Sequence, residues 1–244
     1  MKTRRLSEID LARFAALPPG EPLERALRAY NAGGGGWSYE PIRHSTADVL
    51  AARTPLLGPT KSAPWSSIAA QLVRACNKGK DQVKANVEVG KVLFDAARRM
   101  GWTAAKVEMG RLPIGFGEAV RYWSDVVVED GDGLFIPFFD HRRSGGVANT
   151  AVRQMVFSMQ HLWVRERNPD LMDARLAVVR FPPDDDDEDG RSIRVDFHNE
   201  AELLAYEILD ARVRTVYETW ACVSEEKVRG PRRTGTGSGN PFGF

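Results

Sequence analysis

YWSDVVVEDGDGLFIPFFDHRR, residues 122–143, is the stretch with the clearest structural pattern in the chain. The residues on each side of DGDG are rich in β-branched and aromatic side chains, which favour strands. Asp-Gly pairs are typical of tight turns between two strands. The pattern therefore predicts a β-hairpin, with strands over residues 121–129 and 134–140.

Two aspartates and an arginine lie near the open end of this hairpin. Side chains of a strand alternate between its faces, so the length of the turn decides which side chains share a face. Each of the three two-residue turns within DGDG pairs Asp125 with an even-numbered residue. Asp125, Asp140 and Arg142 are therefore expected on one face, and His141 on the other. A turn with an odd number of residues would separate the two carboxylates.

Two neighbouring carboxylates repel each other unless a cation or a proton lies between them. Mg²⁺, or Mn²⁺ in its place, prefers carboxylate oxygens and also binds the phosphate oxygens of a substrate. Such an ion activates water and stabilises charge on phosphate during hydrolysis. Arg142 would hold a phosphate oxygen, although its guanidinium cannot act as a base. The sequence thus predicts a metal-dependent phosphodiesterase site at Asp125, Asp140 and Arg142.

The pattern around the hairpin predicts an α/β fold. Apolar residues recur at helical spacing over residues 81–101, and a helix is expected from the Asn149 cap to about residue 167. The order is completed by strands expected over residues 103–109, 175–181 and 192–197 and by a last helix over 199–222. Three successive strands, then a helix and another strand, predict a mixed central sheet flanked by helices.

The chain divides by composition into three parts. Residues 1–80 predict a helical N-terminal region with connectors, in which Ser7 and Asp10 resemble a capping box. Residues 81–223 would form the α/β core. Residues 224–244 are rich in Gly, Ser and Arg, as disordered tails are.

The order of elements and the spacing of the acids resemble the core of the PD-(D/E)XK nuclease superfamily, over residues 81–182. In that superfamily an aspartate opens the second strand, and an acid and a lysine lie two positions apart on the third. Asp125 and Asp140 match the two acids, and Glu88 matches the acid that many members add from the first helix. The resemblance implies a restriction-endonuclease-like core and a magnesium-dependent nuclease.

Some positions depart from the pattern or extend it. Arg142 stands where the superfamily has lysine, which implies weakened or absent catalysis. Gln154 or Gln160 matches a glutamine that some members carry on the following helix. Arg143 and Arg153 are candidates for contacts with nucleic acid.

Three functions remain open from the sequence, and with them the question of whether the protein is an enzyme. The first is the nuclease, and the second is an inactive nuclease-like module that binds nucleic acid or a partner protein. The third is an interaction protein that assembles, for example as a homodimer, through its N-terminal helices.

Composition excludes several classes of protein. The chain has 244 residues, a net charge of +1 and only two cysteines, so a disulfide framework is excluded and a reducing cytoplasm is expected. The sequence contains no run of eighteen apolar residues, so no membrane span is expected. The N-terminus lacks the apolar core of a secretory signal.

Overall fold

The structure, a computed structural model, describes residues 6–30, 38–54, 62–109, 111–114, 118–121, 124–187, 190–198 and 203–229. Its helices are α1 (Glu8–Ala15), α2 (Glu21–Ala29), α3 (Glu40–Val49), α4 (Trp65–Ala75), α5 (Lys80–Arg99), α6 (Thr150–Gln160), a π-helical turn η1 (His161–Arg165), a 3₁₀ turn η2 (Pro169–Leu171) and α7 (Tyr206–Arg229). Its strands are β1 (Thr103–Lys106), β2 (Arg111–Ile114), β3 (Glu118–Arg121), β4 (Val126–Asp130), β5 (Gly133–Asp140), β6 (Arg175–Arg180) and β7 (Arg194–Phe197).

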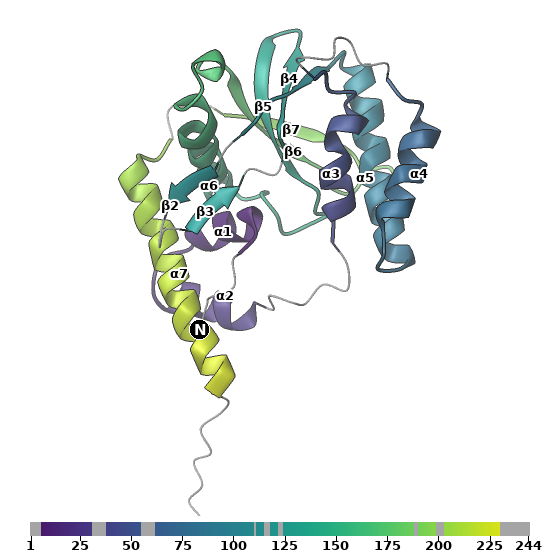
Figure 1. Cartoon of the computed structure of the whole chain (residues 1–244). Coiled ribbons are helices and arrows are strands. Elements are labelled where there is room, and N and C mark those ends of the chain that lie inside the picture. The colour runs from purple at the N-terminus through teal and green to yellow at the C-terminus, as the bar shows by residue number, and fades with distance from the viewer. Residues whose placement is uncertain are drawn as a thin grey trace, which may run out of the picture.

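A mixed sheet lies at the centre of the molecule, with helices on both sides (Figure 1). Its strand order is β1-β4-β5-β6-β7, and β2 and β3 form a separate two-stranded sheet. Neighbouring strands of the central sheet are antiparallel except β5 and β6, which are parallel and are joined through α6. The predicted mixed α/β architecture is therefore confirmed.

The turn of the β4–β5 hairpin has two residues. Val128 pairs with Phe135, and Asp130 pairs with Gly133, which leaves Gly131 and Asp132 as the turn. Gly133 has a φ of 113°, a left-handed conformation that glycine adopts without the steric cost a Cβ would add. The even length expected from DGDG is confirmed.

This register makes both faces of the sheet apolar. On one face, alternate residues of the three central strands pack against α3, α4 and α5; among them are Val128, Phe135 and Val179. The helices can approach closely here, because a Cβ on Gly90 of α5 would lie 2.8 Å from a methyl carbon of Leu72 in α4.

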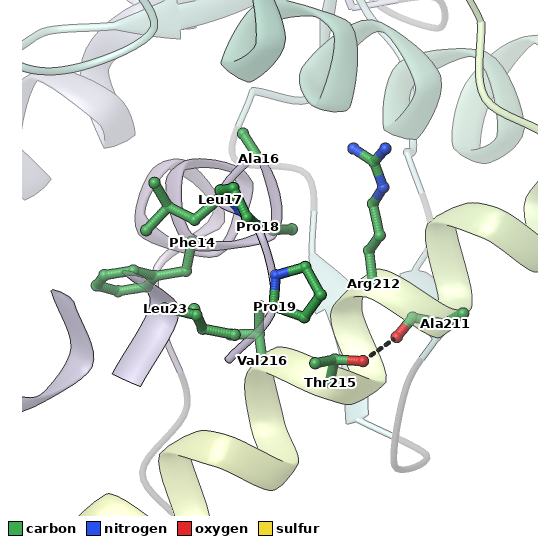
Figure 2. Close-up of a pocket in the computed structure, with 11 residues that line it drawn as sticks. Phe14, Ala16, Leu17, Pro18, Pro19, Leu23, Ala211, Arg212, Thr215 and Val216 are labelled. Atoms are coloured by element: carbon green, nitrogen blue, oxygen red, sulfur yellow. Dashed lines mark hydrogen bonds between the residues drawn. The ribbon is translucent and has the colours of Figure 1, made fainter. Parts of the chain in front are cut away.

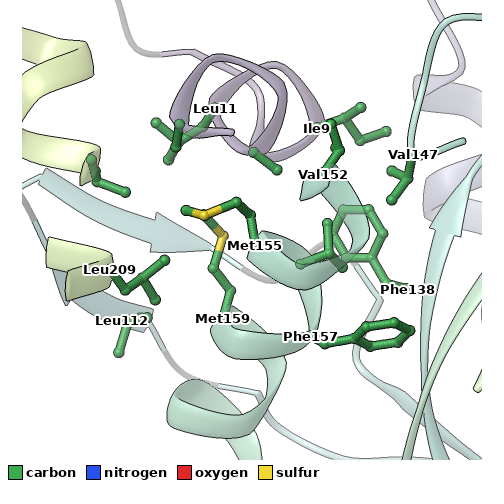
Figure 3. Close-up of a cluster of buried hydrophobic side chains, with 14 of the residues drawn as sticks. Ile9, Leu11, Leu112, Phe138, Val147, Val152, Met155, Phe157, Met159 and Leu209 are labelled. Carbon is green, nitrogen blue, oxygen red and sulfur yellow. The ribbon is translucent and has the colours of Figure 1, made fainter. Parts of the chain in front are cut away.

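The intervening residues of the same strands face the other helices. Val127, Ile136 and Val178 belong to a cluster that also contains side chains from α1, α2, α6 and α7. Figure 3 shows Ile9 and Leu11 of α1 above Met155 and Met159 of α6, with Leu209 of α7 alongside. The N-terminal helices therefore divide between the two faces of the sheet: α1 and α2 pack on one face, and α3 and α4 pack on the other.

Three elements differ from the sequence-based expectation. The strand expected from Arg121 begins at Val126, and the short β2–β3 hairpin precedes it. Helix α3 was not predicted, although Pro41 lies in its first turn, a position at which proline is compatible with a helix. The last helix begins at Tyr206 and runs to Arg229, whereas its predicted Asn199 cap and the tail beyond residue 229 lie outside the described residues.

No helix in the described ranges is both long and apolar enough to cross a membrane.

Candidate functional site

Asp140 is buried at the C-terminal end of β5, with 2% of its surface exposed. Its Oδ1 accepts a hydrogen bond from the backbone N–H of Arg142 at 3.2 Å, and its Oδ2 accepts one from the N–H of Val147 at 2.6 Å. A Cβ on Gly146 would lie 2.5 Å from Asp140 Cγ, so only glycine fits beside this carboxylate. The side chain of Asp140 therefore fastens the loop of residues 141–147 to the end of the strand.

The guanidinium of Arg142 is held by helix α1. Its Nη2 donates to Oδ1 of Asp10 at 2.9 Å, and Asp10 is only 6% exposed. Asp10 also accepts hydrogen bonds from the side chains of Ser7, Tyr30 and Arg13. The Ser7 hydroxyl in turn accepts from the N–H of Asp10, which confirms the predicted helix cap.

These contacts lower the pKa of Asp10. Burial by itself raises the pKa of a carboxyl group, but the positive charge of Arg142 and hydrogen bonds from Ser7, Arg142 and Tyr30 outweigh it and lower the pKa of Asp10. The Asp10 carboxylate is thus stabilised in its charged form, and it ties the loop after β5 to the N-terminal helix.

Asp125 lies just before β4 in a different environment. Its side chain is exposed, and Oδ1 accepts a hydrogen bond from the N–H of Met109 at 3.4 Å. It lines a pocket of about 290 Å³ together with Arg43 and His44 of α3 and Lys106 of β1.

Arg43 supplies positive charge close to both predicted site aspartates. It shares the pocket of Asp125, and it interacts electrostatically with Asp140, Asp10 and Glu8. Burial lowers the pKa of Arg43, and these carboxylates act in the opposite direction. Arg43 belongs to α3, a helix that the sequence patterns did not reveal.

Glu88, the predicted third acid, contacts Arg191. Its Oε2 accepts from Arg191 Nε at 3.2 Å. Arg191 is 8% exposed, and it also donates to the carbonyl oxygen of His141 at 2.9 Å and to the hydroxyl of Tyr39 at 2.7 Å. This buried arginine joins α5 to the end of β5, a role for which the sequence around Arg191 gives no signal.

His141 faces away from Asp140, as predicted, and is stacked among aromatic rings. Its ring lies 5.7 Å from that of Phe181 at an angle of 8°, and about as far from the rings of Phe139 and Tyr39. Its exposed fraction is 1%, and neither ring nitrogen has a hydrogen-bond partner. Burial, followed by the positive charges of Arg43 and Arg191, holds the pKa of His141 well below its ordinary value of 6.5.

Two further predicted residues, Arg153 and Gln160, donate hydrogen bonds to backbone carbonyl oxygens. Arg153 donates to the carbonyl of Ala148 and to the hydroxyl of Thr150, and so lies against the start of α6. Arg143 is half-buried. The Nε2 of Gln160, which is fully buried, donates to the carbonyls of Ile136 in β5 and Ala177 in β6 and bridges the parallel strands.

The described residues contain no group of three or more His, Cys, Asp or Glu side chains that could hold a metal ion. The predicted Mg²⁺ or Mn²⁺ site thus gains no support from the side-chain geometry, and the metal stays an untested prediction. The hydrogen bonds of Asp140 and Arg142 connect the loop of residues 141–147 to β5 and to α1, which is a structural role.

Gly146→Ala should destabilise the protein by at least about 2 kcal/mol, because the new methyl group must displace the buried carboxylate of Asp140. Gly131→Ala is the matched control, since a Cβ there would meet nothing within 4 Å. Urea unfolding of both variants gives the comparison. Equal stability of the two variants would contradict this prediction, because it would show that the loop accommodates the methyl group.

Arg142→Ala should lower the free energy of unfolding by about 2 kcal/mol, because it removes a charge-assisted hydrogen bond from buried Asp10. A double-mutant cycle with Asp10→Ala should give a coupling energy of about 1–3 kcal/mol. The exposed pair Glu21–Arg25 serves as control, with side chains 85% and 74% exposed and an expected coupling below about 0.5 kcal/mol. A coupling energy between Arg142 and Asp10 as small as that of the control pair would contradict this structural role.

The low pKa of His141 predicts a pH dependence of stability. Below its ordinary pKa of 6.5 the unfolded chain takes up a proton that the folded protein excludes, so stability falls as the pH drops. The contribution is at most about 1.4 kcal/mol per pH unit. His141→Phe and His141→Leu should flatten this slope between pH 6.5 and 5, whereas His44→Ala, at an exposed position, should keep it. Thermal melts across this range measure the slope, and an unchanged slope in the His141 variants would refute the assignment.

Comparison with known proteins gives a match over nearly the whole chain. A family model described as "Sliding clamp-binding bacterial toxin SocB" matches residues 9–229, which run from α1 to the end of α7. The DNA replication inhibitor toxin SocB of Caulobacter vibrioides (strain NA1000 / CB15N) is 35% identical over 239 residues, 97% of each chain. No solved structure gives a significant match.

These matches overturn the functional prediction made from the hairpin. The prediction of a magnesium-dependent nuclease is wrong, because the family and the relative are described as a clamp-binding toxin and a replication inhibitor. The alternative of a protein that binds a partner agrees better, since the family description names a protein partner. The resemblance to the PD-(D/E)XK superfamily is tested by none of the comparisons, and a restriction-endonuclease-like core is not confirmed. The chain belongs to the SocB family of sliding clamp-binding bacterial toxins.

Proposed function

We propose that this protein binds a sliding clamp in the cytoplasm and thereby inhibits DNA replication. The observation that carries the proposal is the extent of the family match, which includes both helical layers and every strand of the central sheet. A match of this extent supports a shared mode of action more strongly than a short motif does.

The contacts at the end of β5 agree with action by binding. Asp140, Arg142 and Glu88 each have structural partners. A protein that inhibits by occupying a partner's surface needs no reacting groups, so these residues can serve the fold alone. The net charge of +1 likewise gives no strong attraction to nucleic acid.

The proposal is tested by mixing the purified full chain with the sliding clamp of its own organism. Co-elution on size exclusion and a dissociation constant of about 10 μM or tighter are expected for a specific complex. Primer extension that depends on the clamp should be inhibited, while extension by the same polymerase without the clamp should continue. A plasmid incubated with the protein and Mg²⁺ should stay intact.

Two results would contradict clamp binding: no complex at 100 μM of each protein, or equal inhibition with and without the clamp. Cleavage of the plasmid would show that the protein has nuclease activity. Gly131→Ala is a suitable folded control variant, because that position lies in an open turn.

A further inference from the structure

An apolar groove lies between the turn that follows α1 and the first half of α7 (Figure 2). It has a volume of about 330 Å³, and Phe14, Leu23 and Val216 line it together with Pro18 and Pro19. Leu17 at its edge is 36% exposed. The groove is large enough for an aromatic side chain and its neighbours.

We propose that the groove binds the C-terminal segment Pro241–Phe244 of the same chain. Phe242 and Phe244 are the only large apolar residues after Arg229. Residues 235–244 carry no charged side chain, so their transfer into an apolar groove removes no side-chain charge from water. Burial of a phenylalanine side chain removes a large apolar surface from water, which favours docking of a tethered segment.

The length of the tether fits the distance it must span. Val216 and Ala211, at the near and far ends of the groove wall in α7, lie 13 and 18 residues before Arg229, or about 20 and about 27 Å at 1.5 Å per residue. The twelve residues 230–241 are rich in Gly, Ser and Thr. A connector of this composition has a root-mean-square length of about 5–6 Å multiplied by √12, or about 17–21 Å.

This agreement favours binding within one molecule over binding between two. A tethered segment has its highest effective concentration when its root-mean-square length equals the span, and that concentration is in the millimolar range. A second copy at micromolar concentration competes poorly. The segment would therefore cover the groove of its own chain. The proposal does not depend on clamp binding.

Disulfide trapping in the full chain tests the proposal, with Cys76 and Cys222 first replaced by serine. Ala211→Cys places a thiol at an exposed position in the wall of the groove, and Gly243→Cys places one between the two phenylalanines. In a redox buffer this pair should form an intramolecular disulfide about tenfold faster than the control pair Val73→Cys and Gly243→Cys. Val73 is exposed on α4, among the helices of the other face.

Substitution of Phe242 and Phe244 by serine should return the Ala211 pair to the control rate. Equal rates in the two pairs, or an unchanged rate after the serine substitutions, would overturn the proposal. A cross-linked dimer as the main product would show a second copy in the groove and would also overturn it.

Hydrogen exchange provides a measurement without cysteine substitutions. In the otherwise native chain, Phe242→Ser with Phe244→Ser should speed exchange of the backbone amides of residues 14–17, which the segment would cover. Unchanged exchange at these amides would argue against docking, whatever the stability of the cysteine variants.

Discussion

The two-residue turn between β4 and β5 sets the constraint on which the rest of the fold depends. With Gly131 and Asp132 as the turn, Val128 and Phe135 lie on one face and Val127 and Ile136 on the other. A turn longer or shorter by one residue would exchange the two faces of a strand. Because the side chains on both faces of the sheet are apolar, each face must pack against a layer of helices. One layer consists of α3, α4 and α5, and the other consists of α1, α2, α6 and α7.

The charged residues at the end of β5 connect these two helical layers. Asp140 fastens the following loop, Arg142 connects it to Asp10 in α1, and Arg191 connects the end of the strand to Glu88 in α5. Buried charged groups are costly unless they are paired and hydrogen-bonded, and each of these has a partner. The same pairs bring together segments more than 100 residues apart in the sequence, for example Asp10 and Arg142.

This chemistry explains why an acid-x-arginine pattern at the end of a strand predicted the wrong function. A carboxylate at such a point can hold a metal ion, or it can accept the N–H groups of the loop that follows. Residue spacing is the same in both cases, and the difference lies in what the oxygens contact. Asp140 accepts from two backbone N–H groups, and Asp125 accepts from the N–H of Met109. Function is therefore better indicated by the match over residues 9–229 than by four residues of a motif.

The sequence by itself determined the hairpin, the caps at Ser7 and Asn149 and the mixed sheet, because these depend on side-chain alternation and on contacts within a few residues. It also determined that His141 faces away from Asp140. Only the tertiary structure decided which partners the charged residues take. Arg43 and Arg191 come from segments without a strong pattern, and their positions follow from how α3 and the β6–β7 connection pack on the sheet. Periodicity records which side of an element is buried, whereas the choice between a metal ion, a backbone N–H and a distant arginine depends on atoms that only folding brings together.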